Sequence, residues 1–157
     1  MNGSYFFAVA LGIGIVAGLR AFTAPAVVAW ATHLGWLSLQ DSRLAFVGST
    51  VVVIILSLLA TGELVADKLP KTPRRTALMP LLARICTGAF CGACLSLAAK
   101  QSPLFGALSG GIGGIIGAFV GYEIRRRLVA QLHLKDFVVA GGEDLIAIGF
   151  ACFLVSL

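Results

Sequence analysis

Long apolar runs separated by short polar segments are the main pattern along this chain of 157 residues. A helix needs about 20 apolar residues to cross a hydrocarbon layer about 30 Å thick, and several runs reach that length. The runs cover residues 5–39, 44–66, 77–99, 104–122 and 137–157. The pattern predicts an all-α integral membrane protein with about five transmembrane helices, built as a single transmembrane domain over residues 1–157.

The composition agrees with a membrane protein. Hydrophobic residues make up 59% of the chain and charged residues 12%, with a mean hydropathy of +0.98. About 25% of the residues in an ordinary soluble domain are charged, so that class is excluded. The four cysteines lie within apolar runs and have no metal-ligand spacing, and no cofactor is expected.

The first apolar run, 5–39, is interrupted in its middle by the stretch GLRAFTAP at 18–25. As one helix the run would be about 50 Å long, too long for one crossing and too short for two. The glycine, arginine, threonine and proline favour a broken or kinked element, with two shorter helices meeting at an irregular segment. The alternative is one tilted helix with an interfacial extension that carries Trp30, His33 and Trp36.

A weak internal repeat relates the second and third spans to the fourth and fifth. LLATGELVADKL at 58–69 resembles AFVGYEIRRRLV at 118–129, and each is followed by a basic loop and another apolar run. Such a duplication would give two units of parallel topology. Chance similarity among apolar helices is the alternative explanation.

Two basic segments determine the expected orientation. Residues 68–75 and 125–135 each carry four Lys or Arg residues. Because most of the basic residues lie in these two segments beside apolar runs, the net charge of +5 does not indicate binding to nucleic acid. By the positive-inside rule both segments face the cytoplasm, here of a bacterial inner membrane, and the C-terminus lies on the far side. The N-terminus is cytoplasmic if the first run crosses once, and external if it folds back as a re-entrant pair.

Ionisable side chains within the spans form the candidate site. Each costs about 2.5–3.5 kcal/mol to insert, so each needs a partner or a purpose. Under the expected topology they lie at similar depth in the cytoplasmic half, where one polar pocket made by four helices would collect them. The residues expected to bind an ion or substrate are Arg20, Thr23, Glu63, Asp67, Arg84, Glu143 and Asp144. For Asp67, near the surface, a solvated helix end is the alternative.

A pocket of this kind indicates transport as the first function. Its carboxylates would bind a cation or proton, while the arginines bind an anionic group or tune the carboxylates. We therefore expect a small transporter or channel-like protein for a cation, proton or small charged solute, in which a bound cation is allowed. A charge network that only fixes helix packing is the alternative role of these residues.

Two other functions stay open. A membrane enzyme acting on a phospholipid or polyprenyl phosphate would hold Mg²⁺ with the carboxylates and phosphate with the basic loop. No catalytic motif supports it, and no catalytic residue is assigned. The other alternative is a structural or regulatory membrane subunit.

Basic residues beside the spans are expected to contact the headgroups of anionic lipids. They are Lys68, Lys71, Arg74, Arg75, Arg125, Arg126 and Arg127.

The fourth span is rich in glycine. Overlapping G-x-x-x-G pairs between residues 106 and 121 leave one face nearly bare backbone. Such a face permits close helix approach within the protomer or across a dimer, and we expect a homo-oligomer through this span.

Several of these motifs carry a resemblance to a known family. They are GLRAFTAP at 18–25, ELVADKLPKTP at 63–73, the glycine-rich span ending at Tyr122, and Glu143 with Asp144. With them the chain resembles a bacterial family of small multi-pass membrane proteins described as domain of unknown function 4126. The resemblance covers nearly the whole chain and implies the same architecture, and it attaches no activity.

Overall fold

A computed structural model describes residues 3–66, 77–132 and 136–157. Within these ranges all regular structure is helical. The elements are α1 (Gly3–Leu19), α2 (Thr23–His33), the 3-10 helix η1 (Ala45–Gly48), α3 (Thr50–Ala66), α4 (Leu78–Ala98), α5 (Pro103–Leu132) and α6 (Asp136–Ser156). The predicted all-α class is confirmed.

Three helical segments are long and apolar enough to cross a membrane: Leu78–Ala98, Pro103–Ala130 and Val138–Ser156. The helices α1 and α3 are apolar but shorter, with 17 residues each, or about 25 Å. Large apolar side chains are exposed along α3, α4, α5 and α6, where lipid would cover them. The structure thus supports a membrane protein, while the count of five crossings stays a prediction.

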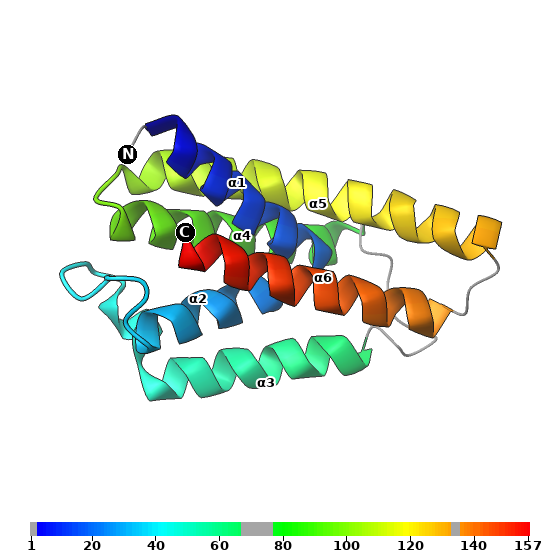
Figure 1. The fold of residues 1–157 in the computed structure, drawn as a ribbon, viewed down its shortest axis with the longest axis horizontal. Coiled ribbons are helices and arrows are strands. Elements are labelled where there is room, and N and C mark those ends of the chain that lie inside the picture. The colour runs from blue at the N-terminus through cyan, green and yellow to red at the C-terminus, as the bar shows by residue number, and fades with distance from the viewer. Residues whose placement is uncertain (1–2, 67–76, 133–135) are drawn as a thin grey trace.

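The helices α1 and α2 form a hairpin, so the chain turns back after its first helix (Figure 1). The N-terminal end of α1 and the C-terminal end of α6 lie at the same end of the bundle (Figure 1). The helix ends that flank residues 67–76 and 133–135 lie at the opposite end. This is the geometry of the re-entrant alternative, with both termini on one side.

The break between the two helices falls at residues 20–22, inside the stretch expected to be irregular. Pro25 lies in the first turn of α2, where a missing N–H breaks no helical hydrogen bond. In one continuous helix its ring would clash with the carbonyl group of Ala21, four residues earlier. The prediction of two shorter helices is confirmed, and the alternative of a single tilted helix is wrong.

The second apolar run becomes an α-helix later than predicted from residue 44. The 3-10 helix η1 comes first, and α3 starts at Thr50. Between them Ser49 has an extended backbone (φ −69°, ψ 144°), and its Oγ accepts the backbone N–H of Val52 at 3.4 Å. A serine in this position caps a helix by satisfying one of its first N–H groups. The cap therefore decides where α3 begins.

The fourth apolar run continues as helix beyond its predicted end at Tyr122, and α5 ends at Leu132. Glu123 accepts hydrogen bonds from Arg126 at 3.0 Å and from Arg127 at 2.7 Å. Pairs three and four residues apart stabilise a helix, so the charged segment prolongs the span instead of ending it.

Glycines of α5 bring its backbone directly against α4 and α1. A Cβ atom at Gly110 would overlap the carbonyl oxygen of Gly88 in α4, and one at Gly117 would overlap that of Ile15 in α1. Every glycine from residue 106 to residue 117 is buried. The glycine face is thus used for packing within the chain. A homo-oligomer stays a prediction, and other residues of α5 would have to form it.

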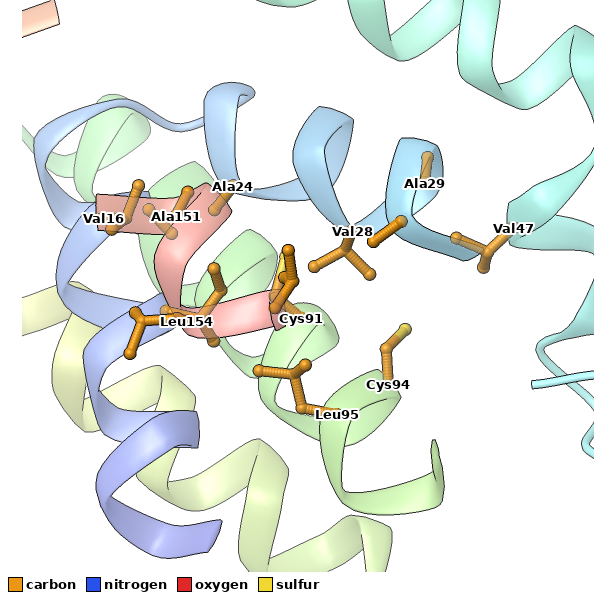
Figure 2. Close-up of a cluster of buried hydrophobic side chains, with 14 of the residues drawn as sticks. Val16, Ala24, Val28, Ala29, Val47, Cys91, Cys94, Leu95, Ala151 and Leu154 are labelled. Carbon is orange, nitrogen blue, oxygen red and sulfur yellow. The ribbon is translucent and has the colours of Figure 1, made fainter. Parts of the chain in front are cut away.

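An apolar core lies where α1, α2, α4 and α6 meet (Figure 2). It brings together Val16 of α1, Val28 of α2, Cys91 of α4 and Ala151 of α6, all of them fully buried (Figure 2). Cys91 packs here as a small hydrophobic side chain, as a free cysteine within an apolar helix commonly does.

The helix α3 lies at the edge of the bundle (Figure 1). Of its 17 residues only Val53 is buried. It rests on α2, where Nε1 of Trp30 donates a hydrogen bond to Oγ of Ser57 at 3.0 Å. A helix with so little of its surface buried needs less rearrangement to move than the helices of the core.

Candidate charged site at the helix break

The break between α1 and α2 carries a buried arginine. Arg20 is 0% exposed, and its Nη2 forms an ion pair with Oδ1 of Asp144 in α6. Its Nη1 donates to the backbone carbonyl oxygen of Glu63 at 3.5 Å. A charge at this depth is stable only with an opposite charge and hydrogen-bond acceptors around it, and the site supplies both.

Glu63, near the end of α3, closes the break with its carboxylate. Its Oε1 accepts the backbone N–H of Ala21 and its Oε2 accepts that of Phe22, each at 2.8 Å. The first N–H groups of a helix have no acceptor within the helix. Phe22, the N-cap of α2, makes no side-chain cap bond, so an acid from another helix satisfies these donors. The negative charge also suits the positive end of the α2 dipole.

Arg84 of α4 joins the same group. Its Nη2 lies 3.5 Å from Oε1 of Glu63, and the side chain is 4% exposed. We call Arg20, Glu63, Arg84 and Asp144 the charged cluster. It balances two positive charges with two negative ones, and the break, α3, α4 and α6 contribute one residue each. These four predicted residues do gather in one place, while their role in binding stays a prediction.

Thr23 and Glu143 take different positions from the cluster residues. Thr23 is buried in the first turn of α2. Oε2 of Glu143 lies 3.9 Å from Nη1 of Arg125 in α5. Glu143 precedes Asp144 on the same helix, and neighbouring residues of a helix point in directions about 100° apart. The two acids therefore form ion pairs with different arginines.

The remaining predicted residues divide into two groups. Arg126 and Arg127 are exposed at the end of the bundle opposite the termini and pair with Glu123. Five residues lie outside the described part of the chain: Asp67, Lys68, Lys71, Arg74 and Arg75.

Two features of the site go beyond the sequence prediction. The backbone N–H groups of Ala21 and Phe22 become available only because the helix breaks beside α3, and no sequence signal announces this. The sequence assigns Arg125 to lipid headgroups, but Arg125 also pairs with Glu143 because α5 continues as a helix alongside α6. The acid–arginine spacing in the segment EIRRR is the signal that points to this continuation.

A cavity of about 630 Å³ opens at the end of the bundle that holds the termini. Its lining includes Val9 of α1, Leu95 of α4 and Leu154 of α6. In each of these three segments, ten or eleven residues separate the cavity residue from the charged-cluster residue: 9 from 20, 95 from 84, and 154 from 144. At about 1.5 Å per residue, all three helices place about 15 Å between the cavity and the cluster.

Apolar side chains fill this interval. We call Ile13, Val16, Val28, Cys91 and Ala151 the apolar plug, and all five are fully buried. Val16, Val28, Cys91 and Ala151 are labelled in Figure 2, in the core between α1, α2, α4 and α6. A packed apolar layer opposes the passage of ions, because each ion would lose its hydration there.

The charged cluster contains two carboxylates and two guanidinium groups. In the part of the chain that the structure describes, no group of three or more His, Cys, Asp or Glu side chains is placed to hold a metal ion. The arrangement observed is thus one of acids paired with arginines at the helix break.

Comparisons with known proteins give one match. Searches of curated proteins and of solved structures find none. The family described as Domain of unknown function (DUF4126) matches residues 7–157, which include every helix from α2 onward and most of α1. The chain therefore belongs to the DUF4126 family.

Proposed function

We propose that this protein is a small transporter or channel-like protein that moves a proton or a small charged solute through the charged cluster. The observation that carries the proposal is the fully buried Arg20, paired with Asp144 at a break between two helices. Broken helices within a membrane protein commonly surround a binding site, because unwound backbone is tolerated only in a protein interior or beside a cavity.

The energetic cost of the cluster supports a functional role. Four ionisable groups within spanning segments cost about 2.5–3.5 kcal/mol each on insertion scales, and packing alone is achieved more cheaply by apolar side chains. Protonation of Asp144 weakens its hold on Arg20, which then accepts another anion. A proton and an anionic solute would in this way be coupled at one site.

Movement through the protein requires the apolar plug to part. The helix α3 is the element best placed to respond, because it is buried only at Val53 and carries Glu63 at its far end. Loss of Glu63 from the break would expose the N–H groups of Ala21 and Phe22 and loosen the α1–α2 hairpin. The state with the plug closed would then correspond to the structure described here.

The membrane orientation belongs to the same proposal. The arginines that follow Glu123 mark the cytoplasmic end under the positive-inside rule, and both termini then lie outside a bacterial inner membrane. The homo-oligomer would use exposed apolar side chains of α5 outside the charged end of the helix, such as Ile112, Ile116 and Phe119.

A structural or regulatory subunit is the second candidate. The charge balance of the cluster favours it, because each acid already has an arginine partner in the folded protein. Both candidates predict a stable charged cluster, and they differ in whether a proton or a charged solute passes through it.

Proton flux into vesicles tests the transport proposal. Purified protein is reconstituted into vesicles with a pH-sensitive dye inside, and a potassium gradient with valinomycin drives proton entry in chloride and then in phosphate buffer. We expect faster acidification than in empty vesicles and its loss in Asp144→Asn. Glu123→Gln is the matched control, because it removes an acid from an exposed pair and should conduct like the wild type. Wild-type flux equal to that of empty vesicles in both buffers would favour the structural subunit.

A further inference from the structure

A groove lies between the C-terminal part of α5 and the N-terminal part of α6. It encloses about 290 Å³ and opens among the exposed side chains of Ile124, Val138 and Ile146. Its other apolar walls come from Leu19, Leu128 and Val139. In a membrane these surroundings place the groove against lipid.

Two glycines leave the groove open. Gly121 and Gly142 both line it, and neither contributes a side chain that could fill it. A Cβ atom at Gly142 would meet no other atom within 4 Å, so the space beside α6 is empty of protein side chains among the described residues. The groove therefore has room for an apolar chain.

One ion pair lies in these apolar surroundings. Arg125 and Glu143 both line the groove, with their side chains 18% and 13% exposed and their charged atoms 3.9 Å apart. Arg125 also lines a second hollow of about 320 Å³ on the other side, together with Tyr122 and Val129. The guanidinium group thus stands between two hollows, one on either side.

We propose that this groove binds an acidic phospholipid, with its phosphate on Arg125 and an acyl chain in the groove. The planar guanidinium group donates two hydrogen bonds to a phosphate more effectively than a single ammonium does. Basic pockets between membrane helices at the end with positive charge are suited to acidic headgroups. Arg126, which lines the second hollow, adds a further positive charge beside the headgroup.

The charge beside the groove favours an acidic lipid over a second copy of the chain as its occupant. In the ion pairs of the described residues, the three arginines 125–127 share two acid partners, Glu143 and Glu123, which leaves an excess of positive charge beside the groove. A symmetric contact through this groove would bring the excess of one protomer toward that of the other, whereas a phosphate neutralises it. Glu143 is the group that the phosphate would displace from Arg125, so it opposes the binding of an anion.

This site does not depend on the proposed transport function, and the variants predict effects of opposite sign. Arg125→Gln should lower the preference for an acidic headgroup by about tenfold or more, the effect of one charge-assisted hydrogen bond. Glu143→Gln should raise it, because the competing acid is gone. Gly142→Leu should abolish retention of both acidic and neutral lipid by filling the groove.

Two matched controls accompany these variants. Gly141→Leu adds the same side chain at a neighbouring position that also has open space but does not line the groove. Arg127→Gln removes an exposed arginine that pairs with Glu123 and lines neither hollow. Both should behave like the wild type.

Native mass spectrometry of protein extracted from vesicles of equal parts phosphatidylglycerol and phosphatidylcholine measures the retained lipid. We expect the wild type to retain one phosphatidylglycerol per chain. Relative to it, the preference for phosphatidylglycerol should fall in Arg125→Gln and rise in Glu143→Gln, and Gly142→Leu should retain neither lipid. Equal retention of the two lipids by the wild type, or the same ratio in Arg125→Gln and Glu143→Gln, overturns the proposal. A wild-type dimer that Gly142→Leu converts to a monomer overturns it as well, in favour of a second copy as the occupant.

Discussion

The substitution Glu63→Gln perturbs the charged cluster with almost no change in side-chain size. In the wild type the two carboxylate oxygens accept the N–H groups of Ala21 and Phe22, and Oε1 lies beside Arg84. Glutamine keeps one oxygen and replaces the other with an NH₂ group, which is a donor. One backbone N–H of the break would then face another donor, and the ion pair between Glu63 and Arg84 would be lost.

The size of the effect follows from the burial of the groups involved. Breaking a buried ion pair by removing the charge of one partner costs about 3–5 kcal/mol. The side chains of Glu63 and Arg84 are only 12% and 4% exposed, so the buried case applies. We expect Glu63→Gln to lower the free energy of unfolding by about 3–5 kcal/mol. The corresponding change at Glu123, which is 35% exposed, should cost about 0–1 kcal/mol.

Equilibrium unfolding in mixed micelles measures this difference. A denaturing detergent is titrated into the purified protein while the fluorescence of Trp30 and Trp36, the two tryptophans of the chain, is recorded. Trp30 is bonded to α3 through Ser57 and reports whether that helix stays in place. If Glu63→Gln unfolds within about 1 kcal/mol of Glu123→Gln, the acid does not close the break in the way described, and the reasoning is refuted.

Two further changes test the packing and the boundaries of the helices. Gly110→Leu should destabilise the protein by about 1–3 kcal/mol or more, because its side chain would overlap the backbone of α4. Gly149→Leu, at an open position on α6, should leave the free energy of unfolding nearly unchanged. Ser49→Ala should cost about 0.5–2 kcal/mol by removing the cap of α3, as measured in the same unfolding titration, and an unchanged stability would mean that the cap does not set the start of that helix.

Much of the fold could be predicted from local pattern. Apolar runs predicted the helices because backbone groups in lipid must bond within their own segment. The GLRAFTAP stretch predicted the break because Pro25 cannot continue a helix through its preceding turn. Two helix boundaries differ from those predicted by the apolar runs. A single capping side chain, Ser49, places the start of α3 within an apolar run. Two local ion pairs of Glu123 extend α5 past Tyr122 into a charged segment.

The candidate site was predictable in part. Buried charge is costly wherever it occurs, so the charged residues of the spans could be named from the sequence alone. Their pairing could not, because an acid can reach any arginine at a similar depth until the helices are placed. Glu143 and Asp144 are adjacent in sequence, yet one pairs with Arg125 and the other with Arg20.

The sequence by itself determined the long apolar helices typical of a membrane protein, the break near residue 20, the glycine-rich packing helix and the charges set among apolar residues. These properties follow from hydrophobicity, proline geometry and the cost of burying charge, which act locally. Only the tertiary structure decided that the first two helices fold back and that Glu63 closes the break between them. It also decided that the glycines of α5 pack against α1 and α4, because such contacts depend on the relative rotation and depth of helices far apart in the chain.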